Sequence, residues 1–186
     1  APWPGAGWCD ACAVALTQVT GGVYCPTCGA AVSPVVVADG RCPRCPWRQV
    51  WHERLTRVGG YEGVLRRAIM GFKYGGQRWM DRLLAELMLA SLAGQPWFGN
   101  VGSIVPVPSH WLRRWRRGYH HVGLLGEELA RLSGKRAVGM LRVVRRVQPQ
   151  VGLDHRQRLT HIRGALGVNR WATRPRGGVL LIHDGE

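Results

Sequence analysis

Three Cys-x-x-Cys pairs within the first 45 residues constrain this chain more than any other feature. Cys9 pairs with Cys12, Cys25 with Cys28, and Cys42 with Cys45, and intervals of twelve and thirteen residues separate the pairs. Two such pairs supply four thiolates at the corners of a tetrahedron, which is the geometry of structural zinc. In a reducing compartment this spacing indicates metal binding, not a disulfide framework. We therefore expect residues 1–50 to form a small zinc-ribbon-like module that a metal ion holds together.

Six thiolates do not divide evenly into sites of four ligands. Three alternatives are open: a further pair precedes Ala1, one pair is idle, or His52 completes a second site. We favour a missing upstream pair, so that the second and third pairs form the complete site and the first pair is left over. A single histidine beside a tryptophan is more often packed or solvated, so His52 is the weaker alternative.

Helical patterns begin only after residue 60, and the first fifty residues show no helical periodicity. Apolar residues recur at helical spacing over 64–72, 83–92 and 122–132, and the last of these helices is expected to stop at Gly134. We therefore expect residues 51–186 to form a separate domain that contains these helices.

Short apolar runs between and after the predicted helices indicate strands. They lie at 104–108, 143–144, 165–168 and 179–182, and the last of them has no polar alternation, as in a fully buried strand. Buried strands that alternate with helices predict an α/β fold with a parallel sheet covered by helices on both faces.

The net charge of +15 implies anionic partners. Arginine carries almost all of it, because Lys73 and Lys135 are the only lysines, and arginine suits phosphate groups of nucleic acids and of small molecules. In the run Arg113-Arg114-Trp115-Arg116-Arg117, the tryptophan could stack on the bases of single-stranded DNA while the arginines contact phosphates. Alternatively, Trp111 and Trp115 form one packed helix face and the arginines are simply solvated, as codon composition alone would allow.

No apolar run reaches the length of a membrane span, and the stretch 83–93 is short and contains Glu86. No secretory signal is apparent, so we expect a cytoplasmic protein. Because the sequence starts at Ala1 and ends soon after the last apolar run, we expect a fragment of a longer chain.

Several short segments follow one another in an order known from one protein family. After the cysteine pairs come Phe72-Lys73-Tyr74-Gly75-Gly76, then Ile104-Val105-Pro106-Val107-Pro108 with Arg117-Gly118-Tyr119, then Gln150-Val151-Gly152-Leu153 with Arg158, and then Gly164-Ala165-Leu166. In this order they resemble the ComF/GntX family over nearly the whole chain. The resemblance implies an incomplete type I phosphoribosyltransferase-like parallel sheet flanked by helices, preceded by a double zinc ribbon.

The function that the resemblance implies is that of a phosphoribosyltransferase, a glycosyltransferase-class enzyme. Such enzymes bind 5-phosphoribosyl 1-diphosphate with magnesium and replace its pyrophosphate by a nitrogen nucleophile. Some members are linked to natural competence and to the handling of single-stranded DNA during DNA uptake. A non-catalytic zinc-ribbon factor that binds single-stranded DNA is the main alternative, and a zinc-dependent adaptor for a partner protein is the least specific one.

Carried over by position, the turn after Pro108, with Ser109, would form the pyrophosphate loop, and Arg117 and Gly118 would close it. Lys73 would face the same cleft, although a role as a cation at a helix end is equally consistent with its position. The remaining implied substrate contacts, on a mobile hood and after the last strand, are Gln150, Arg156, Arg158 and Asp184.

The sequence also departs from the family pattern. Two aspartates and a Thr-Thr-Gly phosphate loop usually follow the last strand, but here His183-Asp184-Gly185-Glu186 follows it, so only Asp184 of that motif is present. The family's Arg-Gly-Phe-Asn-Gln reads Arg117-Gly118-Tyr119-His120-His121. We therefore expect the sequence as it stands, truncated before the phosphate loop, to be inactive. The histidines show no His-Glu-x-x-His pattern and receive no catalytic role.

Overall fold

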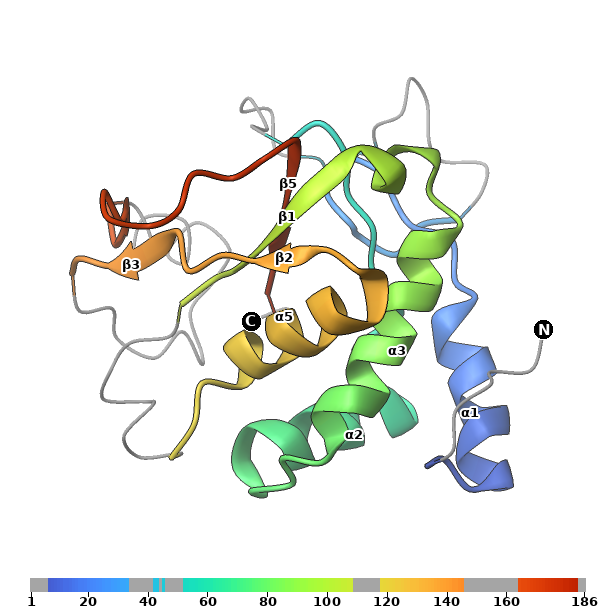
Figure 1. Ribbon diagram of the computed structural model, residues 1–186. Coiled ribbons are helices and arrows are strands. Elements are labelled where there is room, and N and C mark those ends of the chain that lie inside the picture. The colour runs from blue at the N-terminus through green and yellow to red at the C-terminus, as the bar shows by residue number, and fades with distance from the viewer. Residues whose placement is uncertain are drawn as a thin grey trace.

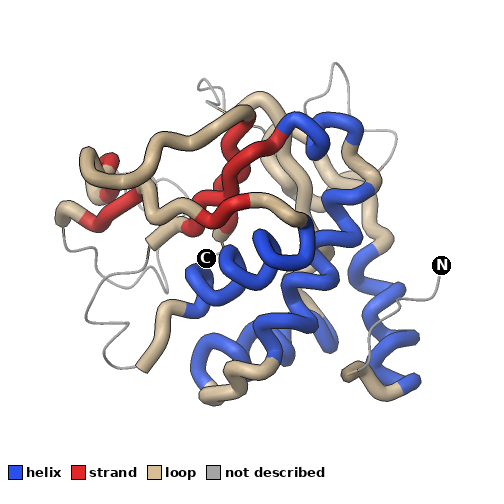
Figure 2. Tube along the Cα trace, in the orientation of Figure 1, coloured by secondary structure: helices blue, strands red, loops and turns tan. Residues whose placement is uncertain are grey.

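The computed structural model describes residues 7–33, 42–43, 45, 52–108, 118–145 and 164–183. Helices in these ranges are α1 (Asp10–Thr20), α2 (Gly63–Tyr74), α3 (Met80–Ala93), the 3₁₀ helix η2 (Pro96–Asn100) and α5 (His121–Ser133). Strands are β1 (Val101–Pro106), β2 (Arg136–Ala137), β3 (Leu141–Val143), β4 (Leu166–Val168) and β5 (Gly178–Ile182). Figures 1 and 2 show the helices gathered below and beside the strands.

The central sheet is parallel and has the order β2-β1-β5. Ile104 of β1 pairs with Ala137 of β2 on one side and with Leu180 of β5 on the other. The parallel pairing of β1 and β2 follows from the crossover through α5, because parallel neighbours need a connection that returns the chain to the starting edge. β3 and β4 form a separate antiparallel ribbon. The predicted α/β class with a parallel sheet is confirmed.

The hydrophobic core lies between this sheet and the helices. α5 packs directly on β1 and β5 at Gly126, where an added Cβ atom would lie only 2.5 Å from Cγ of Pro106. On the opposite side α5 packs against α3, and the fully buried side chains include Phe72, Ile104 and Leu129. Helices α2, α3 and α5 occupy the predicted stretches, and Gly134 ends α5 with a φ of 68°, in the left-handed region that glycine adopts most readily.

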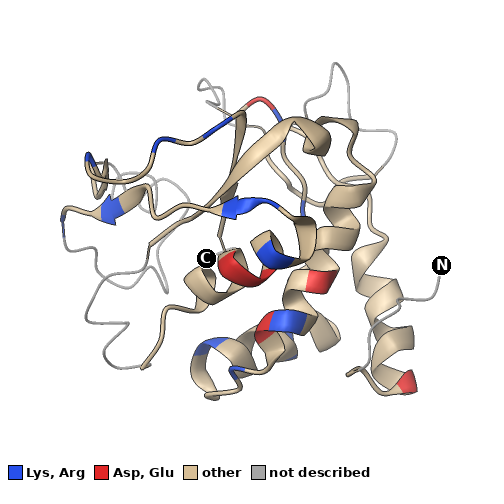
Figure 3. Cartoon of the chain, viewed as in Figure 1, with Lys and Arg blue, Asp and Glu red and all other residues tan. Residues whose placement is uncertain are grey.

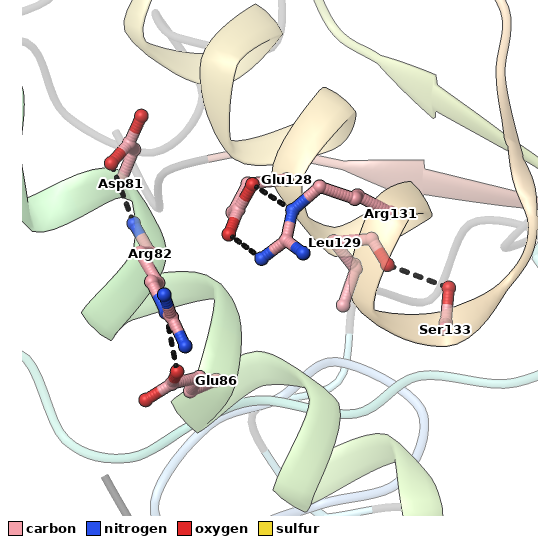
Figure 4. A network of polar contacts seen from close by, with 7 residues as sticks. All are labelled: Asp81, Arg82, Glu86, Glu128, Leu129, Arg131 and Ser133. Atoms are coloured by element: carbon pink, nitrogen blue, oxygen red, sulfur yellow. Dashed lines mark hydrogen bonds and ion pairs between the residues drawn. The ribbon is translucent and has the colours of Figure 1, made fainter. Parts of the chain in front are cut away.

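Charged side chains line the α3 and α5 surfaces that face each other (Figure 4). Arg131 of α5 binds Glu128 through Nε at 2.8 Å, and Arg82 of α3 binds Glu86 through Nε at 3.0 Å. Hydrogen bonding from Arg131 lowers the pKa of Glu128, and the charges of Arg131 and Arg82 add to this effect. The network therefore favours the ionised form of the Glu128 carboxylate between α3 and α5.

Helix α1 differs from the sequence expectation, which placed no helix in the first fifty residues. Its residue Leu16 is fully buried and belongs to the same core cluster as Val64, Leu65 and Phe72. Cys12, Ala15 and Val19 pack against the same core beside Leu16, so α1 carries a short apolar stripe at helical spacing that the sequence expectation missed. Packing against α2 stabilises it.

Strand β5 is present as predicted, but the expectation that it is fully buried was wrong. Ile182 is buried on the helix side, whereas Val179 and Leu181 are 43% and 55% exposed. In the described part of the chain β5 is an edge strand, and the helices cover one face of the sheet instead of both (Figure 1). None of the described helices is long and apolar enough to span a membrane.

Candidate functional site

Four of the six cysteines meet at one point of the structure. The metal-ligating atoms of Cys25, Cys28, Cys42 and Cys45 all lie within 4.8 Å of one another. Cys25 and Cys28 share a tight turn, in which the amide of Gly29 donates to the carbonyl of Cys25 at 2.8 Å. A second turn brings Cys45 back toward Cys42, with an amide to carbonyl distance of 2.9 Å. Each Cys-x-x-Cys pair thus directs two sulfurs to the same side.

The sulfur positions fit a tetrahedral metal ion. Zn–S bonds of about 2.3 Å at tetrahedral angles place the sulfurs about 3.8 Å apart. The distance from Cys25 Sγ to Cys45 Sγ is 3.4 Å, from Cys28 Sγ to Cys42 Sγ 3.6 Å, and from Cys42 Sγ to Cys45 Sγ 3.9 Å. A disulfide requires about 2.05 Å, and all six cysteines are free. The cluster can therefore bind a metal such as zinc.

The thiols of the cluster differ in how readily they ionise. Burial opposes ionisation of Cys25, but the amides of Cys28 and Thr27 donate to its sulfur and lower its pKa to about 6. Burial raises the pKa of Cys28 to about 12. A bound cation favours the thiolate form of every ligand, so metal binding would release protons from the cluster.

The segment from His52 to Arg57 braces the first of these turns. His52 Nε2 lies 2.7 Å from the carbonyl oxygen of Thr27, and Arg57 Nη1 donates to the carbonyl of Gly29 at 3.1 Å. Tyr24 adds a hydrogen bond between its hydroxyl and Thr56. His52 is therefore a support for the turn, outside the four-sulfur cluster.

The remaining pair, Cys9 and Cys12, stands at the beginning of α1. Cys9 is the exposed N-cap residue, and Cys12 packs partly against the core. In the described part of the chain these two join no group of three or more metal-ligating side chains. Their role as metal ligands stays a prediction.

A second candidate site lies at the carboxyl edge of the parallel sheet. β1 and β5 end side by side, with Pro106 opposite Ile182 and the amide of Val107 donating to the carbonyl of Ile182 at 3.0 Å. Beside this edge is a pocket of about 290 Å³. Its lining residues are Pro106, Pro108, His120, Glu127, Ala137, Val138, Gly139 and Leu141. In open α/β sheets, ligands bind at this edge.

The last turn of α2 contacts the residues that lead into α5 and its first turn. Tyr119 donates its hydroxyl to the carbonyl of Phe72, and its ring lies 5.9 Å from that of Phe72. Lys73 follows Phe72 and is 2% exposed, and His121 is equally buried. The structure thus places a buried lysine at the C-terminal end of a helix, while its predicted contact with substrate stays a prediction.

Two other predicted substrate residues are described. Pro108 lines the pocket, and Gly118 has a φ of 75°, in the left-handed region that favours glycine. His120 and Glu127 were not predicted as site residues, although both line the pocket. No sequence pattern singles these two residues out, because only the packing of α5 on the sheet brings them to the pocket.

The other predicted positions lie outside the described residues. They are Ser109, Arg117, Gln150, Arg156, Arg158 and Asp184 for the substrate, and Arg113, Arg114, Trp115 and Arg116 for nucleic acid.

Comparison with known proteins yields relatives from Haemophilus and Salmonella. The chain is 27% identical to competence protein F of Haemophilus influenzae over 166 residues, which are 87% of this chain and 70% of that protein. The similarity to the ComF family is thereby confirmed. This ComF-like chain is also 31% and 30% identical to the DNA utilization proteins YhgH of Salmonella typhi and Salmonella typhimurium. It spans 56% of the length of each of these two proteins. No family model and no solved structure matches the ComF-like chain.

Proposed function

We propose that this is a phosphoribosyltransferase-like protein of DNA uptake, with a structural zinc ion and a site for phosphoribosyl diphosphate and magnesium. The names of the relatives, competence protein F and DNA utilization protein, supply the DNA context. The zinc ion would be held by the four clustered thiolates, since zinc favours sulfur ligands at tetrahedral spacing.

The observation that carries the substrate proposal is the convergence at the carboxyl edge of the sheet. The ends of β1 and β5, the first turn of α5 and the pocket lined by His120 lie together there. Amide groups at a helix N-terminus favour anions, and Lys73, which the family resemblance directs toward the same cleft, would add a positive charge. Magnesium takes one or two carboxylates, for which Glu127 in the pocket and Asp184 after β5 are the candidates.

Calorimetric titration of the full-length protein with phosphoribosyl diphosphate and magnesium tests this proposal. We expect binding heat that requires magnesium and that weakens in Lys73→Gln. Lys135→Gln is the matched control, because Lys135 binds the carbonyl of Val101 at the opposite end of β1. Absence of heat while the metal site is intact would overturn the substrate assignment.

A non-catalytic factor for single-stranded DNA is the second candidate. It is favoured by the charge distribution, because residues 129–145 and 164–183 contain seven arginines, one lysine and no acidic residue. Phosphate contacts release counterions, so affinity for single-stranded DNA must fall steeply as salt is added. Affinity that does not change with salt would exclude this candidate.

A further inference from the structure

Trp171, in the segment between β4 and β5, displays its indole ring almost completely to solvent. It is 95% exposed, although a buried tryptophan removes 150–250 Å² from water and is normally stabilising. The turn that carries it is hydrogen-bonded: the amide of Trp171 donates to Oδ1 of Asn169 at 3.2 Å, and the amide of Ala172 donates to the carbonyl of Asn169 at 3.1 Å. The amide of Asn169 donates a hydrogen bond to the carbonyl of Met140 at 2.8 Å, next to β3.

Exposed arginines lie on the segment that carries this turn and on the neighbouring strand β3. Arg142 lies on β3, while Arg170, Arg174 and Arg176 lie along the segment that leads from β4 to β5. Figure 3 shows this region with basic residues and no acidic ones, and the described residues after Glu128 contain no carboxylate side chain. Within the described residues 129–145 and 164–183, no carboxylate side chain balances this positive charge.

Apolar side chains are exposed on the same ribbon. Arg142 is paired with Gly167, and an added Cβ atom at Gly167 would lie 2.9 Å from Cγ1 of Val144. Val144 therefore lies over Gly167, on the same face of the β3–β4 ribbon as Arg142, and its side chain is 49% exposed. We name the set Arg142, Val144, Arg170, Trp171 and Arg174 the arginine–tryptophan surface.

We infer that the arginine–tryptophan surface binds single-stranded nucleic acid, with Trp171 stacking on a base and the arginines contacting phosphates. An exposed indole matches a ligand with accessible flat faces, which unpaired bases have and paired bases lack. The uncompensated guanidinium groups match a chain of phosphates. This inference rests on the second candidate function and assigns it residues other than the 113–117 run.

Fluorescence anisotropy of labelled single-stranded DNA, RNA of the same sequence and a duplex tests the inference. Trp171→Ala should weaken single-strand binding about tenfold, as expected for the loss of one base–aromatic stack. Trp79→Ala is the matched control, because Trp79 is 60% exposed on another element, and it should leave affinity unchanged.

The arginines are tested by salt dependence. Arg142→Gln combined with Arg174→Gln should reduce the slope of log affinity against log salt by about 1.4 for single strands. Arg67→Gln, at an exposed position of α2, removes a charge elsewhere and should leave the slope unchanged. Circular dichroism of each variant establishes that it is folded.

Binding of single-stranded DNA or RNA that Trp171→Ala weakens supports the inference. The nucleic acid that binds more tightly, DNA or RNA, is then the natural ligand. If the protein binds single strands but Trp171→Ala and Trp79→Ala behave alike, the surface is wrongly assigned while the DNA-binding function stands. An equal effect of Arg67→Gln and the arginine pair would also overturn the surface, since total charge would then explain binding. If no strand binds at all, both the surface and the DNA-binding function are wrong.

Discussion

The hydroxyl group of Tyr119 joins α2 to the residues that lead into α5. The family pattern has phenylalanine where this chain has Tyr119, and the hydroxyl of Tyr119 binds the carbonyl of Phe72. Tyr119→Phe should lower the free energy of unfolding by about 1 kcal/mol, because a buried hydrogen bond is lost. Urea denaturation measures the difference, with Tyr61→Phe, at a 49% exposed position, as the control. Equal stability of Tyr119→Phe and the wild type would show that the bond contributes nothing.

A second single residue, Glu128, makes a contribution to the free energy of unfolding that depends on pH. Arg131 lowers the pKa of Glu128 from its ordinary 4.5, so the pair stabilises the folded state at neutral pH. This stability is lost as the pH falls through the lowered pKa, because the carboxyl group is then protonated in both states. Glu128→Gln should therefore be less stable than the wild type at pH 7 and equally stable in strong acid. A gap in urea midpoint that is independent of pH would contradict the ion pair.

Among the elements, α5 determines the shape of the carboxyl edge through its close approach to β1. Gly126→Ala gains helix propensity of about 1 kcal/mol but forces a methyl group against Pro106, and overpacking costs about 1–3 kcal/mol. The variant should thus lose up to about 2 kcal/mol, seen as a lower melting temperature. Gly94→Ala at the end of α3 is the control, because an added Cβ atom there meets nothing within 4 Å. A Gly126→Ala variant as stable as this control would show that the contact is loose.

Predictability of the elements depended on how each one is buried. α2 and α5 each bury one face, so the spacing of Val64, Leu65 and Ala68, and of Val122, Leu125 and Leu129, predicted them. α1 buries only Leu16 fully, and its short apolar stripe of Cys12, Ala15, Leu16 and Val19 was missed. The apolar run of β5 predicted a strand but not its exposure, because the sequence does not reveal which strand lies at the edge of a sheet.

The candidate sites divide in the same way, into features that local spacing predicts and features that only the folded structure reveals. The four-cysteine cluster joins the two pairs that the favoured alternative grouped, but the Cys-x-x-Cys spacing itself fixes only each local turn and not which pairs meet. His120 and Glu127 were missed, because only the folding of α5 onto the sheet brings them to the pocket. Trp171 was also missed, as exposure of an aromatic residue depends on the surrounding structure and leaves no periodic signal.

For the whole molecule, the position of α1 predicts how metal removal affects the fold. Leu16 packs into the core of the helical layer, whereas the turn from Cys25 to Gly29 is held by the cluster and by the segment 52–57. Chelation should therefore release the amides of this turn to rapid hydrogen exchange while α1 and α2 remain protected. Added zinc should restore protection. Loss of protection in α1 together with the turn would place α1 in the metal-dependent unit.

The most direct test of the account is X-ray absorption at the zinc edge of the purified protein. Because the sulfurs of Cys25, Cys28, Cys42 and Cys45 surround one point, we predict a single shell of four sulfur ligands at about 2.3 Å. Cys25→Ala should remove one of them. A protein without zinc, or a shell dominated by nitrogen and oxygen, would contradict a four-thiolate metal centre.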